Sequence, residues 1–147
     1  MPEEEELLDE KAAVKALNKA LELQYRSALQ YSLTSSSLTG IPAQAIGGLL
    51  IEYGDRELAD ARLLIEKIVS FDGTPTTKVA ELRNPKGVDD GLDRLIETEA
   101  EVIEAMQQAI EPTGREGRSE ALEHMLEHMI MRKQRQVDLL ERARSDG

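Results

Sequence analysis

The stretch MIMRKQRQVDLL, residues 129–140, has the apolar spacing of an amphipathic helix but breaks it with two polar residues. Its apolar residues recur at steps of three and four, which is the spacing of a helix face that packs into a core. Lys133 and Gln136 fall on this same face. Because burying an unpaired charge is costly, we expect these two side chains to meet polar partners from other segments.

Glycine and proline divide the chain into four segments that have this spacing. The breaks are TGIP at 39–42, DGTPTT and NPKG within 72–87, and EPTGREG at 111–117. Between them we expect four helices and no strand, in a single domain over residues 1–147, with helices over about 6–37, 43–71, 89–110 and 117–143. This predicts an all-α fold, a four-helix bundle. The connection over residues 72–88 could reach about 55 Å at full extension. It could therefore run the length of the bundle, or close a short antiparallel hairpin.

The apolar face of each segment is interrupted near its middle by polar residues. They are Gln24 on the first segment, Glu57 and Asp60 on the second, Glu99 on the third, and Lys133 and Gln136 on the fourth. Residues equally far from a hairpin turn lie at one level of the hairpin. Gln24 and Glu57 are equally far from the first break, and Glu99 and Lys133 from the third. The pattern predicts a polar layer across the bundle, as a metal site, an internal salt-bridge network or a catalytic pocket.

Composition excludes several other functions. The chain has no cysteine, which excludes disulfides, thiolate metal sites and cysteine nucleophiles. Its net charge of -11 disfavours nucleic acid and anionic lipid as partners. No apolar run approaches the roughly 20 residues of a membrane span. The N-terminal MPEEEELL is acidic where a signal peptide is basic, so we expect a cytoplasmic protein.

Three stretches resemble the helices of bacterioferritins, which are ferritin-like di-iron proteins. They are LNKALELQYRSALQY at 17–31, DRELADARLLIEKIVSFDGTP at 55–75 and ETEAEVIEAMQQAI at 97–110. The resemblance implies a ferritin-like four-helix bundle with a long crossover between the second and third helices. It also implies a central ferroxidase site, with one Glu from each of two helices and a Glu-x-x-His from each of the others.

The candidate metal ligands depart from this family pattern at four of six positions. Glu57 and Glu99 match, and Asp60 replaces a His but could still bind a hard cation through oxygen. The weaker candidates are Gln24, which replaces a Glu, and Gln136, which replaces a His. Lys133 replaces a Glu and cannot bind metal while it is protonated.

Two further positions bear on cofactors. Tyr31 matches a family tyrosine that hydrogen-bonds near the site, although it could equally be a core aromatic. Leu58 stands where bacterioferritins have the Met that binds haem, so we expect no haem.

The charges of the layer limit its metal content. Three carboxylates and Lys133 sum to a charge that one divalent ion would balance and two would exceed. Alternatively, Lys133 is the resident cation and one carboxylate takes up a proton through a raised pKa. We therefore expect iron or another divalent metal at no more than one ion per chain, or none.

Three functions follow from these expectations. The first is a bacterioferritin-like protein of the iron-storage superfamily with a degenerate di-iron site. The second is a non-enzymatic structural or partner-binding bundle with an internal Lys–Glu network. The third is an active ferroxidase-type oxidoreductase, and in all three cases we expect a homo-oligomer, a dimer or larger.

A pair of histidines is a separate candidate. His124 and His128 are four residues apart and could chelate a metal with Glu127. His124 stands nine residues before Lys133, so on a helix its side chain points away from the polar layer. We therefore expect a surface position or a subunit contact for His124.

Overall fold

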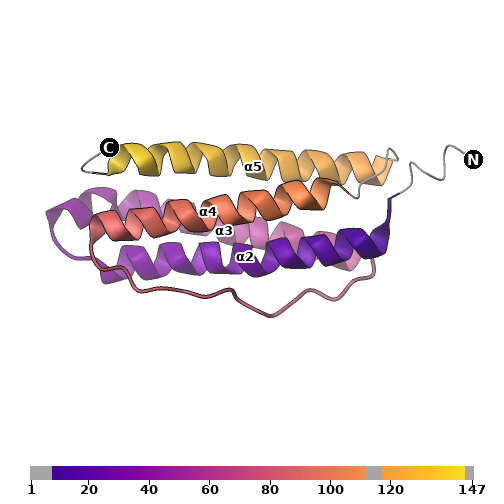
Figure 1. Cartoon of the computed structure of the whole chain (residues 1–147), viewed down its shortest axis with the longest axis horizontal. Coiled ribbons are helices and arrows are strands. Elements are labelled where there is room, and N and C mark those ends of the chain that lie inside the picture. The colour runs from indigo at the N-terminus through magenta and orange to yellow at the C-terminus, as the bar shows by residue number, and fades with distance from the viewer. Residues whose placement is uncertain (1–7, 112–116, 145–147) are drawn as a thin grey trace, which may run out of the picture.

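The computed structural model describes residues 8–111 and 117–144, which form four helices and no strand (Figure 1). These are α2 (Glu10–Ser37), α3 (Ile41–Ser70), α4 (Val88–Ile110) and α5 (Gly117–Ala143). The predicted all-α four-helix bundle is confirmed. Residues 6 and 7, where the first helix was expected to begin, lie outside the described residues, as do residues 112–116 of the third break.

Local signals explain where the first two helices begin. The side chain of Asp9 accepts a hydrogen bond from the backbone N–H of Ala12 at 3.1 Å and so caps α2. Gly40 has a φ of 97°, a left-handed conformation that favours glycine, and Pro42 follows in the first turn of α3.

Residues 71–87 carry no helix and run along α2 (Figure 1). The side chain of Asn18 hydrogen-bonds the backbone of Thr74 and Thr76 near one end of this segment. The side chain of Gln30 accepts from the backbone N–H of Arg83 at 3.1 Å and donates to its carbonyl oxygen at 2.7 Å, near the other end. In consequence α3 and α4 run in the same direction, opposite to α2 and α5 (Figure 1).

The buried apolar residues form two clusters, one toward each end of the bundle. The larger cluster includes Leu17, Leu64, Met106 and Leu126, and the smaller one includes Tyr31, Tyr53, Leu92, Leu95 and Leu140. Between them in sequence, on all four helices, lie the buried polar residues of the predicted layer. The polar layer therefore separates two apolar cores. Within the described ranges, no helix is long and apolar enough to cross a membrane.

Candidate functional site

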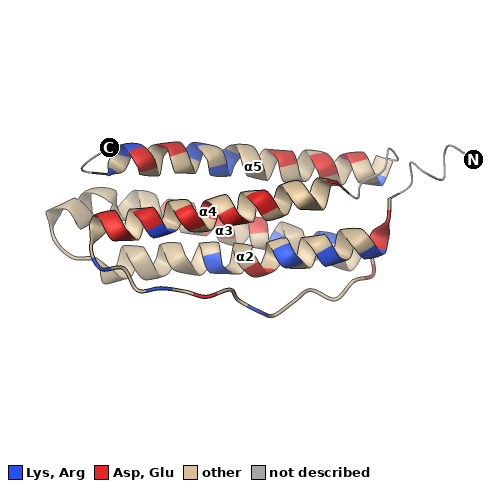
Figure 2. Cartoon of the chain, viewed as in Figure 1, with Lys and Arg blue, Asp and Glu red and all other residues tan. Residues whose placement is uncertain are grey.

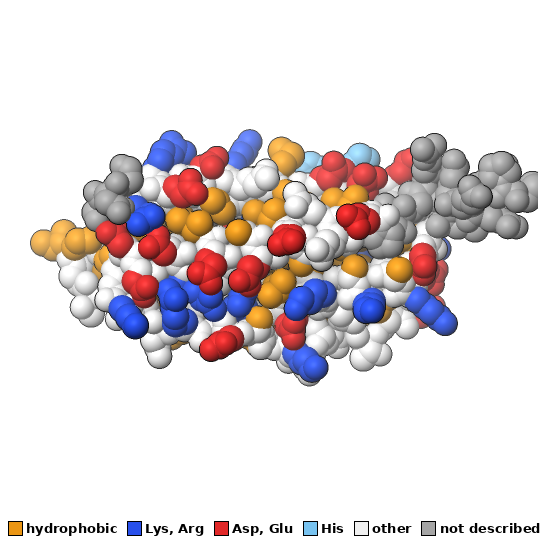
Figure 3. Space-filling view, viewed as in Figure 1, with side chains coloured by type: hydrophobic (Ala, Val, Ile, Leu, Met, Phe, Trp, Pro, Cys, Tyr) orange, Lys and Arg blue, Asp and Glu red, His pale blue; other side chains and the backbone are white. Residues whose placement is uncertain are grey.

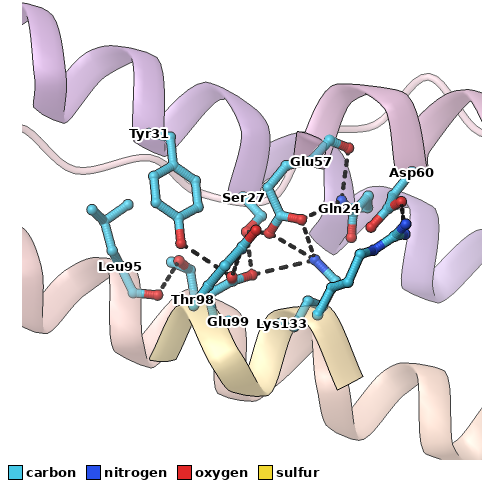
Figure 4. A network of polar contacts seen from close by, with 11 residues as sticks. Gln24, Ser27, Tyr31, Glu57, Asp60, Leu95, Thr98, Glu99 and Lys133 are labelled. Atoms are coloured by element: carbon cyan, nitrogen blue, oxygen red, sulfur yellow. Dashed lines mark hydrogen bonds and ion pairs between the residues drawn. The ribbon is translucent and has the colours of Figure 1, made fainter. Parts of the chain in front are cut away.

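The six polar residues on the helix faces are all buried at one level of the bundle (Figure 4). Their exposed fractions are 0% for Gln24, 1% for Glu57, 3% for Asp60, 0% for Glu99, 0% for Lys133 and 2% for Gln136. Helical spacing places them there, because each continues the three- and four-residue spacing of the inward face of its own helix. The hydrogen bonds among these side chains decide what the layer can do.

Lys133 lies at the centre of the layer. Its Nζ donates to both carboxylate oxygens of Glu57 at 2.7 Å and to Oε1 of Glu99 at 3.2 Å (Figure 4). The ammonium has three N–H donors, and these three contacts account for them. A fully buried ammonium thus joins one carboxylate from α3 to one from α4.

Ser27 links the same two carboxyl groups from α2. Its Oγ lies 2.9 Å from Oε1 of Glu57 and 3.0 Å from Oε1 of Glu99. A hydroxyl has a single proton, so it can donate to only one of these oxygens and must accept from the other. The geometry is satisfied when Glu99 is protonated, donates to Ser27, and Ser27 donates to Glu57.

The second oxygen of Glu99 is held by two donors. The hydroxyl of Tyr31 donates to Oε2 of Glu99 at 3.1 Å, and Nε2 of Gln136 donates to the same atom at 2.5 Å. Burial raises the pKa of Tyr31 well above its ordinary value, and the carboxyl groups of Glu99 and Glu57 raise it further. Tyr31 is therefore a neutral donor at physiological pH.

The electrostatics of the layer separate the two glutamates. Burial opposes the ionisation of Glu57, but the Lys133 charge and the surrounding hydrogen bonds outweigh it and lower the pKa of Glu57 to about 2. Burial raises the pKa of Glu99 to about 8, against the pull of Lys133 and with the charge of Glu57 adding to the rise. Burial lowers the pKa of Lys133, but the two glutamates outweigh it and the net shift is upward. At neutral pH the centre is a Glu57–Lys133 ion pair beside a protonated Glu99.

Asp60 faces away from this centre, toward Arg132 on α5. The Arg132 guanidinium pairs with Oδ1 of Asp60, and Arg132 is about half exposed while Asp60 is buried. Burial raises the pKa of Asp60, and the charges of Lys133 and Arg132 oppose that rise. With Glu99 protonated, two carboxylates and two cations make the layer neutral without a metal ion.

Gln24 is fixed by the backbone of α3. Its Nε2 donates to the backbone carbonyl of Glu57 at 2.7 Å and to Oε2 of the same residue at 3.2 Å. Its Oε1 is buried and has no hydrogen-bond partner among the described residues. Among the described residues, this amide oxygen is the one fully buried side-chain acceptor of the layer that has no partner.

The donor set does not fit a two-metal centre. Lys133 Nζ stands between Glu57 and Glu99, and Asp60 is turned to Arg132. Within residues 8–111 and 117–144, no group of three or more Asp, Glu, His or Cys side chains is arranged to hold a metal ion. A di-iron site needs several converging carboxylates, and here an ammonium occupies the position where they converge.

Two contacts of the layer were not expected from the sequence. Ser27 lies three residues after Gln24 on the same helix face, and this spacing could have indicated it. Arg132 is exposed on α5 and reaches Asp60 only because its side chain is long, so no periodicity indicates it.

The remaining candidates lie outside the layer. His124 is exposed on α5, as expected, and His128 is exposed on the same helix. Nδ1 of His124 lies 3.9 Å from Oε1 of Glu127. Leu58 is also on the surface, with an exposed fraction of 47%.

Comparisons with known proteins agree with this architecture. A family model described as a ferritin-like domain matches residues 14–145. A ferritin-like, diiron-carboxylate protein from Bacillus anthracis str. Ames is 25% identical, with a TM-score of 0.84 over 91% of this chain and 96% of its own. Comparison of the sequence with curated proteins gives no match.

Two more distant structures share the fold. A dodecameric thioferritin, the bacterioferritin-related protein from Bacteroides fragilis, is 17% identical, with a TM-score of 0.83 over 95% of this chain and 88% of its own. BfrA from M. tuberculosis is 19% identical, with a TM-score of 0.79 over 88% of this chain and 80% of its own. At these identities the likeness concerns the fold alone.

Proposed function

Because this chain belongs to the ferritin-like domain family, we propose that it is a bacterioferritin-like bundle whose central site is degenerate and held by Lys133 instead of metal. In this proposal the layer is an internal Lys–Glu network that fixes the packing of four helices and does not oxidise iron. The observation that carries it is the Lys133 ammonium, 2.7 Å from both oxygens of Glu57 and 3.2 Å from Glu99.

The charge balance supports this proposal. A cation at this point would have to displace an ammonium that already carries the positive charge of the layer. It would also have to remove the proton of Glu99, whose pKa is raised to about 8. Both changes cost free energy, and only a tightly bound metal ion would offset that cost. The network is therefore the function that the geometry supports best.

A second candidate is a single divalent ion beside the network. The buried, unpartnered Oε1 of Gln24 favours it, because a carbonyl oxygen is a suitable ligand for a hard cation. Asp60 would supply a carboxylate once Arg132 had moved away, because Glu57 is already paired with Lys133. Metal analysis of the purified protein separates the candidates, with about one ion per chain for this alternative and none for the network.

A repair experiment tests the proposal and the assignment of the six positions together. Gln24→Glu, Asp60→His, Lys133→Glu and Gln136→His are introduced in one variant. We expect this variant to bind two iron ions per chain and to oxidise Fe²⁺, while the unmodified protein stays at the background rate. The matched control changes the first, second and fourth positions and keeps Lys133, and we expect it to remain inactive.

Two outcomes of the repair would contradict the proposal. Iron oxidation above background by the unmodified protein would show that Lys133 does not block the site. A folded quadruple variant that binds no iron would show that the six positions are not those of a ferritin-like centre.

We also propose that the chain is a cytoplasmic homo-oligomer. The dodecameric state of the related Bacteroides fragilis protein supports self-association. Sedimentation analysis of the purified protein tests the self-association, and a monomer at all concentrations would refute it.

A further inference from the structure

A groove of about 510 Å³ runs along the outside of the bundle between α4 and α5. Its floor is apolar and includes the partly exposed side chains of Ile96, Ile103 and Val137. Figure 3 shows this face, with apolar side chains exposed between acidic ones. An apolar floor that stays open to solvent between two helices is typical of a contact surface.

The rim of the groove is acidic, and among the described residues neither Lys nor Arg lines the groove itself. Glu104 on α4 and Asp138 and Glu141 on α5 line it, and all three are exposed. Glu104 also lines a neighbouring hollow together with Lys19 of the same chain. Within the described residues none of the carboxylates of these three residues lies in an ion pair. Two other glutamates of α4 are paired within the chain, Glu97 with Arg94 and Glu101 with Arg26. Asp138 and Glu141 therefore carry negative charge that no ion pair within the described residues neutralises.

The chain itself carries a matching basic stripe. Lys11, Lys15 and Lys19 are exposed on α2 and lie four residues apart, so they share one helix face. Successive lysines are separated by about 6 Å along the axis. Figure 2 shows these basic residues gathered on the N-terminal half of α2 and acidic ones spread along α4 and α5. Lys19 also pairs with Glu22 at 3.4 Å, a contact on the surface.

We propose that the basic stripe of one copy of this chain docks in the acidic groove of a second copy. The net charge of -11 makes two copies repel one another over most of their surfaces. Electrostatic attraction arises where opposite charges face each other, and the stripe and the groove are such a pair. The aliphatic stems of the lysines would cover the apolar floor while their ammonium groups reach the rim.

This inference rests on the self-association proposed above and not on the central layer. It names the two surfaces that meet, and the layer plays no part in it. Its failure can therefore be told apart from failure of the Lys–Glu network.

Two charge-reversal variants test it. The stripe variant carries Lys11→Glu, Lys15→Glu and Lys19→Glu, and the groove variant carries Glu104→Lys, Asp138→Lys and Glu141→Lys. We expect each variant alone to associate about 100-fold more weakly than the unmodified protein, since three exposed pairs become three repulsions. Analytical ultracentrifugation over a concentration series measures the change.

Mixing the two variants gives the sharper result. The acidic stripe of the first then matches the basic groove of the second, although both variants keep a negative net charge. We expect the mixture to form heterocomplexes that neither variant forms alone, and raising the salt concentration to dissociate them. The control variant Arg62→Glu, Lys78→Glu and Lys86→Glu makes the same charge change as the stripe variant at other exposed positions, and we expect it to associate like the unmodified protein.

Three results would overturn the proposal. An oligomer that neither variant weakens would show that assembly uses other surfaces. Variants that weaken assembly but do not combine on mixing would show an effect of charge without docking. A monomeric unmodified protein would refute both this inference and the self-association on which it rests. Circular dichroism checks that each variant is folded, and the salt dependence of the unmodified oligomer tests the ionic contact without any substitution.

Discussion

Replacing Lys133 with Met removes the positive charge at the centre of the layer and keeps most of the side-chain volume. Glu57 then remains buried without the ammonium that lies 2.7 Å from both of its oxygens. Ser27 and Gln24 still donate to it, but neither carries charge. We therefore expect Glu57 to take up a proton in the variant and the folded state to lose stability.

The size of the loss can be worked out in two ways. The pKa of Glu57 falls from 4.5 to about 2 in the folded protein. A carboxylate whose pKa is lowered in the folded state stabilises the fold at every pH above its ordinary pKa. For Glu57 this shift corresponds to about 3 kcal/mol at pH 7. Removing one partner of a buried ion pair costs about 3–5 kcal/mol. Both routes predict a fall in Tm of about 10 °C.

Urea unfolding and differential scanning calorimetry at pH 7 measure the change. The matched surface control is Arg135→Met, an exposed position on the same helix, where we expect a change within about 0.5 kcal/mol. The double variant Lys133→Met with Glu57→Gln removes both charges, and we expect it to be more stable than Lys133→Met alone. If Lys133→Met stays within about 1 kcal/mol of the unmodified protein, Lys133 is not the counter-ion of Glu57 and the reasoning is wrong.

Three further predictions concern the same fold. The pKa of Glu99 is raised to about 8 from 4.5, so the folded state holds an extra proton between these values and stability falls as pH rises across them. Glu99→Gln mimics the protonated form and should flatten this part of the unfolding free energy profile; an unchanged slope would contradict the raised pKa. Ser27→Ala removes the hydroxyl between the two glutamates and should cost about 1–3 kcal/mol in urea unfolding, whereas no loss would show that the link is weak. A Cβ at Gly73 would lie 2.6 Å from Val14, so Gly73→Ala should lower Tm and Val14→Ala should partly restore it; equal Tm values for Gly73→Ala and the unmodified protein would refute this close contact.

Much of the fold follows from the spacing of the apolar residues. The four helices are separated by breakers such as Gly40 and Pro42, and the polar interruption at Lys133 indicates the level of the layer. This works because helical period and distance from a turn fix which residues lie at one level. The direction of the connection after α3 did not follow from this spacing. It depends on hydrogen bonds that Asn18 and Gln30 of α2 make to the backbone of the connection.

The contacts within the layer were less predictable than its position. The sequence places Asp60 on the inner face, but its carboxylate pairs with Arg132 at the surface. The reason is that a long, flexible side chain can reach a neighbour outside the periodic pattern. Ser27 is similar, because one hydroxyl between two carboxyl groups depends on side-chain rotamers that no spacing specifies.

Crystals of the protein grown with excess Fe²⁺ under anaerobic conditions would test the central claim most directly. Diffraction data on both sides of the iron absorption edge locate iron in the layer. We expect no anomalous peak between Glu57 and Glu99, and continuous density for Lys133 reaching both carboxyl groups. An iron peak at that point, with the Lys133 side chain displaced, would contradict the claim that its ammonium stands in place of the metal.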